Sequence, residues 1–217
     1  MKAYVITIME NEKSVQSAER CIKSAAKFGV EVEKFKAITP ADDPKTMMMQ
    51  RQINYENFDE VYSRTQNCMA AFLSHFTLWE KCALDNETYL IFEHDAIMTG
   101  FLPPNPQFMY CMTIGKPSYG SYNTPLGFGV NPLTQKEYFG GAHSYMLKPN
   151  GAWSLIEGAQ HNPGPTDVFL NKQNFPWLQE LYPWVAEAKD NFSTIQVTRG
   201  CLAKHQYNEE TYRIENV

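Results

Sequence analysis

The stretch "YLIFEHDAIM" at residues 89–98 decides the fold class and contains the first candidate site. Its apolar and aromatic residues run directly into Glu93, His94 and Asp95, after which the chain turns apolar again. A short apolar run bounded by polar residues is typical of a buried strand. The acids are therefore expected at the carboxyl end of a strand, which is the edge where open α/β sheets bind ligands.

The segments before this strand alternate between strand and helix patterns. Residues 3–9 and 30–38 have the alternation and the β-branched content that predict two strands. Apolar residues recur every three or four positions over 15–25 and again over 68–83, which predicts two helices. Strand, helix and strand in close succession form a βαβ unit, which usually pairs in parallel. The sequence therefore predicts an α/β fold with a mostly parallel central sheet flanked by helices.

The second half of the chain is less regular. Residues 99–141 hold many prolines and glycines with little periodicity, so we expect an irregular insertion there. Regular patterns then return. They predict a strand at 142–147, a short helix at 150–159, a helix start at Gly164-Pro165, and late strands at 181–188 and 193–198.

Composition argues against several classes of protein. The 217-residue chain has a net charge of −5, a pI near 5.6 and no long Lys/Arg block, which argues against a general polyanion binder. Its five cysteines include no C-x-x-C pair, so we expect reduced, buried thiols and no cysteine zinc site. No signal peptide is visible, nor the ~18 apolar residues that a transmembrane helix needs. We expect a soluble, cytoplasmic protein without a transmembrane segment.

The spacing of the two acids suggests a specific chemistry. Residues two apart in a strand point the same way, so Glu93 and Asp95 would project together, with His94 on the other side. Two hard oxygen ligands suit Mn²⁺ or Mg²⁺, which neutralises a diphosphate, as in the DxD element of nucleotide-sugar transferases. On these three residues alone, two solvated acids at a strand end are the favoured interpretation. The strand context and the lack of an adjacent Lys or Arg make the two interpretations equal.

Short motifs along most of the chain follow one another in the order of a known family. They are "YVITI" at 4–8, Ala37-Ile38-Thr39, "CMAAFLSHFTLW" at 68–79, "FEHD" at 92–95, "GAHSYMLKPNGA" at 141–152, "PTDVFL" at 165–170 and Ser193-Thr194-Ile195. In this order the motifs resemble glycosyltransferase family 25, whose members include lipopolysaccharide and procollagen sugar transferases. One departure is His94, which stands where the family usually has Asp.

This resemblance implies a GT-A-like fold, a Rossmann-type sandwich in a single domain. We expect a nucleotide-binding half at 1–98, an acceptor-side insertion at 99–141, and an acceptor-side half with the C-terminal tail at 142–217. The implied enzyme moves a hexose or pentose from a nucleoside-diphosphate sugar, usually a UDP-sugar, to an acceptor hydroxyl with inversion. The acceptor would be a glycan such as lipopolysaccharide or a hydroxylated side chain, and a modified (hydroxymethylated) nucleic-acid base remains an alternative.

The resemblance also implies roles for single residues. Asp167 is the candidate general base, although a carboxylate beside a helix start also has a capping role. Asp95 would bind the diphosphate and a Mn²⁺ or Mg²⁺ ion, with His205 as a third metal ligand or simply a surface histidine. The candidate donor-binding residues are Thr7, Thr39, Ser74, His75, Glu93, His94 and Asp95. The alternative roles for these residues are turn contacts, helix packing and structural hydrogen bonds.

The irregular segment contains aromatic residues that would suit a sugar or a base. Tyr119, Tyr122 and Phe128 either stack on an acceptor or pack within their own segment. Two other functions use the same acids. A metal-dependent phosphohydrolase or nuclease would need a second carboxylate cluster, and none is obvious in the sequence. A nucleotide-sugar-binding module that has lost its chemistry would keep the fold, with His94 as the sign of that loss.

Overall fold

A computed structural model describes residues 1–58, 63–189, 192–197 and 213–215 of the chain. Its main feature is a seven-stranded sheet. In spatial order the strands are β2 (Glu33–Lys36), β1 (Lys2–Thr7), β3 (Tyr89–Glu93), β7 (Ser144–Leu147), β5 (Cys111–Thr113), β8 (Gln179–Tyr182) and β6 (Gly129–Pro132).

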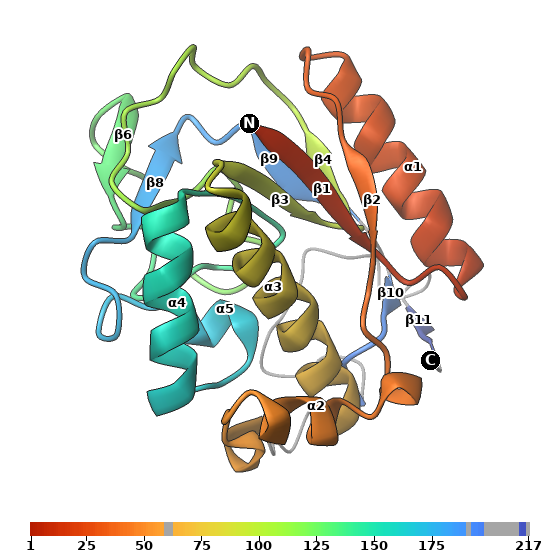
Figure 1. The fold of residues 1–217 in the computed structure, drawn as a ribbon. Helices are drawn as coiled ribbons and strands as arrows, with labels where there is room; N and C mark the ends of the chain where they lie inside the picture. Colours follow the sequence, from red (N-terminus) through yellow and green to blue (C-terminus); the bar gives the residue numbers. More distant parts are fainter. Residues whose placement is uncertain (59–62, 190–191, 198–212, 216–217) are drawn as a thin grey trace.

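Helices cover both faces of this sheet, which confirms the predicted α/β class. The helices are α1 (Glu12–Ala26), α2 (Pro44–Gln50), α3 (Thr65–Asp85), α4 (Pro149–His161) and α5 (Thr166–Phe169), with 3₁₀ turns η1 (Pro40–Asp42) and η2 (Tyr55–Phe58). Helix α1 lies on one face, and α3 and α4 lie on the other (Figure 1). Because side chains alternate along a strand, Ala3 and Val5 of β1 pack on the α1 side, whereas Tyr4 and Ile6 pack on the α3 side.

The sheet is parallel around β1 and mixed beyond β3. Strand β1 pairs in parallel with β2 and with β3, which confirms the predicted βαβ arrangement. Strand β7 is antiparallel to β3 and β5, whereas β8 is parallel to β5 and antiparallel to β6. Strands β2 and β3 flank β1 on opposite sides, so the strand order reverses at β1. Open α/β sheets bind ligands beyond the carboxyl ends of the strands at such a point.

Residues 99–141, which we expected to be irregular, contribute two strands to the central sheet. Strand β5 lies inside the sheet between β7 and β8, and β6 forms its edge. The two strands are only three and four residues long, and their partners are distant in sequence. A period-2 pattern cannot be recognised in segments this short.

The strand expected at 181–188 is wrong as one continuous element. Strand β8 ends at Tyr182, before Pro183, and a separate strand β9 (Ala186–Ala188) pairs antiparallel with β4 (Ala96–Met98). Proline ends the pairing because it has no N–H to donate. At the other late position, the described residues hold a two-residue strand β10 (Phe192–Ser193), which pairs with β11 (Arg213–Ile214).

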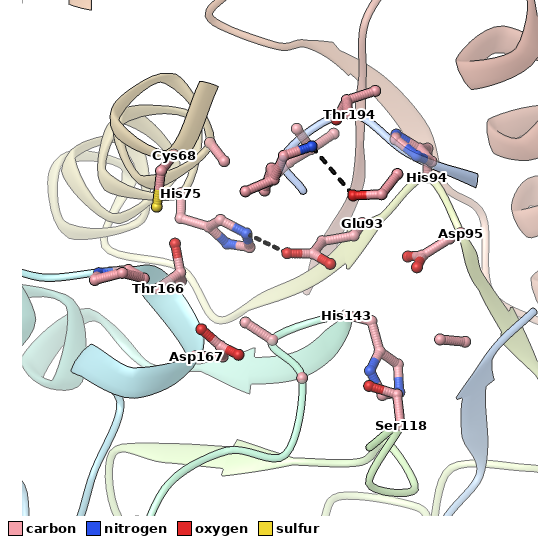
Figure 2. A pocket seen from close by; sticks show the side chains of 18 of the residues that line it. Cys68, His75, Glu93, His94, Asp95, Ser118, His143, Thr166, Asp167 and Thr194 are labelled. Atoms are coloured by element: carbon pink, nitrogen blue, oxygen red, sulfur yellow. Dashed lines mark hydrogen bonds and ion pairs between the residues drawn. The ribbon is translucent and has the colours of Figure 1, made fainter. Parts of the chain in front are cut away.

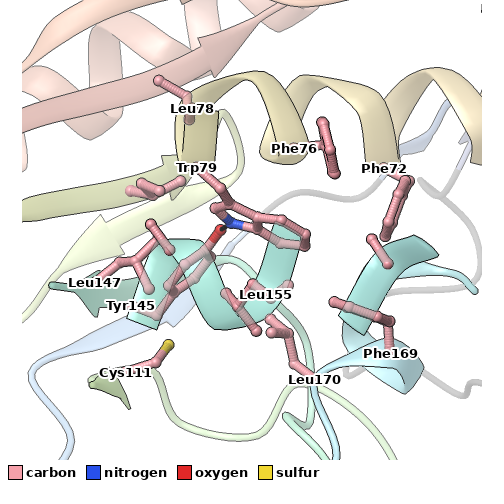
Figure 3. Packing of buried hydrophobic residues seen from close by; sticks show 14 of the residues in the cluster. Phe72, Phe76, Leu78, Trp79, Cys111, Tyr145, Leu147, Leu155, Phe169 and Leu170 are labelled. Carbon is pink, nitrogen blue, oxygen red and sulfur yellow. Dashed lines mark hydrogen bonds between the residues drawn. The ribbon is translucent and has the colours of Figure 1, made fainter. Parts of the chain in front are cut away.

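The core between α3, α4 and α5 is built from aromatic rings (Figure 3). Trp79 is completely buried on α3 and stacks on Phe169 of α5, with ring centroids 5.5 Å apart. Phe72 meets both rings edge-on, at 5.6 Å from Trp79 and 5.4 Å from Phe169. Each aromatic pair adds about 0.5–1.5 kcal/mol beyond the area it buries. These contacts fasten the short α5 to α3.

Four of the five cysteines behave as predicted. Within the described residues, Cys21, Cys68, Cys82 and Cys111 are buried and form no disulfide, while Cys201 lies outside those residues. Burial raises the pKa of the Cys21 and Cys82 thiols to about 12, so both are protonated at neutral pH. Among the described residues, no helix combines the length and the apolar character needed to cross a membrane.

Candidate active site

A cavity of about 470 Å³ lies beyond the carboxyl ends of β1, β2 and β3. Its position matches the point where the strand order reverses, and its volume is typical of small-molecule sites. One wall comes from α3 and the end of β3, including His75, Glu93 and Asp95. Another wall comes from α5 and the loop after β5, including Asp167 and Tyr119. Residues from both halves of the chain therefore line the cavity.

The acid cluster spans the end of β3 and the turn after it. Strand β3 ends at Glu93, and His94 and Asp95 form the turn before β4. The carboxylates of Glu93 and Asp95 are directed toward the cavity, while the His94 ring turns to the other side (Figure 2). His94 Nδ1 lies 3.1 Å from Ser14 Oγ, and the ring stacks on Phe192 of β10 at 5.4 Å. His94 therefore makes structural contacts and, like the two acids, lines the cavity.

A buried chain of hydrogen bonds holds Glu93. The Trp79 Nε1–H donates to Tyr145 Oη at 2.8 Å, as Figure 3 shows. Tyr145 Oη lies 2.9 Å from His75 Nδ1, and His75 Nε2 lies 3.1 Å from Glu93 Oε1 (Figure 2). An indole N–H can only donate, so Tyr145 Oη accepts from Trp79, and burial keeps the Tyr145 hydroxyl protonated by raising its pKa. The hydroxyl hydrogen is thus available to His75 Nδ1 when that nitrogen is the acceptor. His75 then carries its hydrogen on Nε2 and donates it to Glu93.

This chain fixes both the position and the charge of Glu93. Burial by itself would raise the pKa of Glu93, but the hydrogen bond from His75 and the nearby histidine rings outweigh it and lower the pKa below its ordinary value. Glu93 is therefore an ionised carboxylate at neutral pH, with one oxygen held by His75. The motif residues His75, Trp79 and Tyr145, which are far apart in sequence, thus act on one carboxylate.

Asp167 lies across the cavity, in the first turn of α5 (Figure 2). Its Oδ1 accepts a hydrogen bond from Val168 N at 3.0 Å, and its Oδ2 accepts one from the Tyr119 hydroxyl. Burial, and then the charge of Asp167, raise the pKa of Tyr119, so Tyr119 remains a donor. These donors orient the carboxylate on the wall of the cavity.

Of the other predicted donor-binding residues, two line the cavity and one does not. Thr39 lines the cavity and is bonded to Asp42 through its N–H and its hydroxyl. Ser74 also lines the cavity, and its Oγ accepts from Ile38 N and donates to Ala70 O, both at 2.9 Å. Thr7 is completely buried and does not line the cavity, because its hydroxyl donates to Val5 O. Thr39 and Ser74 are thus placed to contact a ligand in the cavity, and Thr7 is not.

Of the three aromatic residues proposed to stack on an acceptor, only one lines the cavity. Tyr119 lines the cavity, whereas Tyr122 packs on Trp184 and Phe128 packs on Tyr182, at ring distances of 5.6 and 5.9 Å. These two contacts lie outside the cavity lining. Tyr119 alone of the three is placed to meet a ligand there.

The predicted metal site stays a prediction. His205 lies outside the described residues, so the structure does not place it. In the ranges that the structure describes, no group of three or more His, Cys, Asp or Glu side chains forms a metal cluster. The oxygen atoms of Asp95 and Glu93 are suitable ligands for Mn²⁺ or Mg²⁺, which commonly keep water and phosphate oxygens in their coordination sphere.

His143 is a pocket residue that sequence reasoning missed. It precedes β7, lines the cavity and is only 2% exposed. A Cβ on Gly115 would lie 2.4 Å from its Nε2, and one on Gly141 would lie 2.9 Å from its Nδ1, so only glycines leave room for this ring. Neither ring nitrogen has a hydrogen-bond partner within the described part of the chain. The glycine pair before His143 was the available sequence signal.

We expect His143 to make the protein acid-sensitive. Burial lowers the pKa of His143 from 6.5 to about 4, although Glu93 and Glu187 act in the opposite direction. Between these two values the unfolded chain binds a proton that the folded chain does not, so stability is complete above pH 6.5 and falls as the pH drops toward 4. At about 1.4 kcal/mol per pH unit, the loss is about 3 kcal/mol.

The measurement is urea unfolding of the wild type and His143→Leu at pH 7, 5.5 and 4. The free energy of unfolding of the wild type should fall by about 3 kcal/mol more than that of the variant over this range. Groups that do not interact with His143 titrate in both proteins and cancel in the comparison. Parallel curves of stability against pH would contradict the prediction.

Comparison with known proteins was made at the level of families and of single proteins. The model of glycosyltransferase family 25 (LPS biosynthesis protein) matches residues 1–108, about half of the chain. No curated protein matches the chain. Ser74, His75, Glu93 and Asp95 lie within the matched residues, whereas Asp167 lies beyond them.

Proposed function

Because this chain belongs to glycosyltransferase family 25, we propose that its cavity binds a nucleoside-diphosphate sugar and transfers the sugar, with inversion, to a hydroxyl of a glycan such as lipopolysaccharide. The observation that carries this proposal is the arrangement of Glu93, Asp95 and Asp167 among the four carboxylates that line the cavity. The fourth, Glu187, forms an ion pair with Lys189 at 3.0 Å. Glu93 and Asp95 stand at the edge of the sheet, and Asp167 stands on the opposite wall. This separation suits a donor held on one side and an acceptor activated on the other.

The donor side is the edge formed by β1, β2 and β3. A UDP-sugar is the donor that we propose, with its diphosphate near Asp95. Two negatively charged groups repel each other, so this placement needs a divalent cation, Mn²⁺ or Mg²⁺, held by Asp95. When bound, such an ion neutralises the charge that develops on the leaving diphosphate. Glu93, held by His75, is placed to accept hydrogen bonds from hydroxyls of the ribose or the donor sugar.

The acceptor side is the wall that carries Asp167. In an inverting transfer, the acceptor oxygen forms a bond to the anomeric carbon while the bond from that carbon to the diphosphate oxygen breaks on the opposite face. The diphosphate leaves with the bonding electron pair, and the proton of the acceptor hydroxyl passes to Asp167. The hydrogen bonds from Tyr119 and Val168 hold the carboxylate in the orientation that this transfer requires.

The donor site is tested by titrating UDP into the protein in the presence of MnCl₂. We expect Asp95→Ala to weaken UDP binding about 10- to 100-fold, as loss of a metal-site carboxylate or its support commonly does. Glu31→Ala, which removes an exposed carboxylate outside the cavity, is the matched control and should bind UDP like the wild type.

Release of free UDP from a panel of UDP-sugars then measures turnover. Equal UDP affinity of the Asp95→Ala variant and the wild type would contradict the donor site. UDP-sugar binding without turnover on any offered glycan would instead indicate a nucleotide-sugar-binding module. Transfer to a hydroxymethylated base, with no transfer to glycans, would show that the acceptor is a nucleic-acid base and would leave the proposed transfer reaction unchanged.

A further inference from the structure

Lys136 stands on the acceptor wall of the cavity in an aromatic setting. Its Nζ lies 5.3 Å from the ring centroid of Tyr119 and 5.5 Å from that of Tyr138. The two tyrosine rings lie nearly parallel to each other, with centroids 6.3 Å apart. Lys136, Tyr119 and Tyr138 all line the cavity. The ammonium group is therefore held against two aromatic rings at the edge of the proposed reaction centre.

Two glycines leave the space that the lysine side chain occupies. A Cβ on Gly120 would lie 3.0 Å from Lys136 Nζ, and one on Gly140 would lie 3.1 Å from Lys136 Cδ. Gly120 also has a φ of +64°, which other residues rarely adopt. Two segments that are distant in sequence thus form a slot for one side chain. The lysine is placed by the fold and does not simply extend from the surface.

The charge of Lys136 has no matching carboxylate among the residues that the structure describes. Within the described residues, no carboxylate oxygen lies within 4.0 Å of its Nζ. Glu137, the next residue in the sequence, pairs with Lys172 at 3.0 Å instead. Burial lowers the pKa of Lys136, which is the expected effect on a cation without an ion-pair partner. A half-buried ammonium that faces a cavity is suited to bind an anion brought in by a ligand.

We propose that Lys136, with Tyr119 and Tyr138, forms a subsite for a carboxylate or phosphate group on the acceptor sugar. This inference rests on the proposed function and adds that the preferred acceptor is an anionic glycan. The acceptor is favoured as the source of the anion because Tyr119 is bonded to Asp167, the proposed base, and Lys136 contacts Tyr119. The acids of the donor side, Glu93 and Asp95, lie on the other wall. The donor diphosphate is the other possible source, and the test separates the two.

The test compares a charged ligand with an uncharged ligand of the same shape. The full chain, with UDP and MnCl₂, is titrated with methyl glucuronide and separately with methyl glucoside, and binding is followed by NMR. We expect the wild type to bind the charged ligand about tenfold more tightly, since a charge-assisted hydrogen bond is worth at least that factor. Lys136→Met should reduce the preference to less than about twofold, and Lys136→Arg should retain most of it.

Lys172→Met removes the same charge outside the cavity and should leave the preference unchanged. Equal binding of the two ligands by the wild type, or an unchanged preference in Lys136→Met, would overturn the subsite. A loss of UDP affinity in Lys136→Met with the preference intact would assign the anion to the donor and overturn the acceptor subsite. A preference that depends on Lys136 in a protein that does not bind UDP would support the subsite and contradict the donor proposal alone.

Discussion

Asp167→Asn is expected to lower kcat for sugar transfer by about 10²- to 10⁴-fold, the usual contribution of a positioned general base. Asparagine has nearly the same shape as aspartate, and its carbonyl oxygen can still accept from Val168 N or from Tyr119. The variant therefore keeps α5 in place and loses only the ability to accept a proton. Transfer is measured as UDP release in the presence of donor and acceptor at saturating concentrations.

The UDP affinity of the same variant shows whether the loss of kcat comes from the acceptor side alone. UDP affinity of Asp167→Asn should stay within about twofold of the wild type, because Asp167 lies on the opposite wall from Glu93 and Asp95. Tyr119→Phe should have a smaller effect than Asp167→Asn, since it removes one orienting hydrogen bond and leaves the carboxylate. An Asp167→Asn protein with a kcat within tenfold of the wild type would show that another group takes the proton.

The fold of the first half could be predicted because its signals are local. Strands β1 and β3 have long apolar runs, and α3 has a continuous helical pattern, so each element can be recognised without its neighbours. The site at the end of β3 followed from the general rule for strand ends in α/β sheets. The motif residues His75, Trp79 and Tyr145 were recognised one by one, but only the structure shows that they form a single hydrogen-bond chain to Glu93.

The parts that the sequence did not predict depend on contacts between distant segments. Strand β5 is three residues long and is defined by its pairing with β7 and β8. Lys136 carries no local pattern, and His143 has only the glycine pair before it. Each is placed by two glycines that lie apart in the sequence, such as Gly115 and Gly141 for His143. A lone histidine or lysine is usually a surface residue. Among the described residues, His143 is distinguished by its burial and its unpartnered ring nitrogens. Lys136 is distinguished by its place in the cavity lining against two tyrosine rings.

Trp79→Ala is expected to lower the free energy of unfolding by about 3–5 kcal/mol, the range for removal of a large buried aromatic side chain. Trp79 is completely buried, stacks on Phe169, meets Phe72 edge-on and donates to Tyr145. Its removal leaves a cavity between α3 and α5 and takes one donor from the chain that ends at Glu93. Urea unfolding at pH 7, above the range in which His143 titrates, measures the effect.

Two further variants separate packing from hydrogen bonding in this prediction. Trp79→Phe keeps an aromatic ring but removes the N–H, so we expect a loss of only about 1–2 kcal/mol. Trp153→Ala removes an exposed indole from α4 and should change stability by less than about 0.5 kcal/mol. Because Phe169 lies two residues after Asp167 in α5, Trp79→Ala should also lower kcat more than it lowers UDP affinity. A stable Trp79→Ala protein with normal kcat would mean that α5 is held without this stack, and the link between the core and the proposed base would be lost.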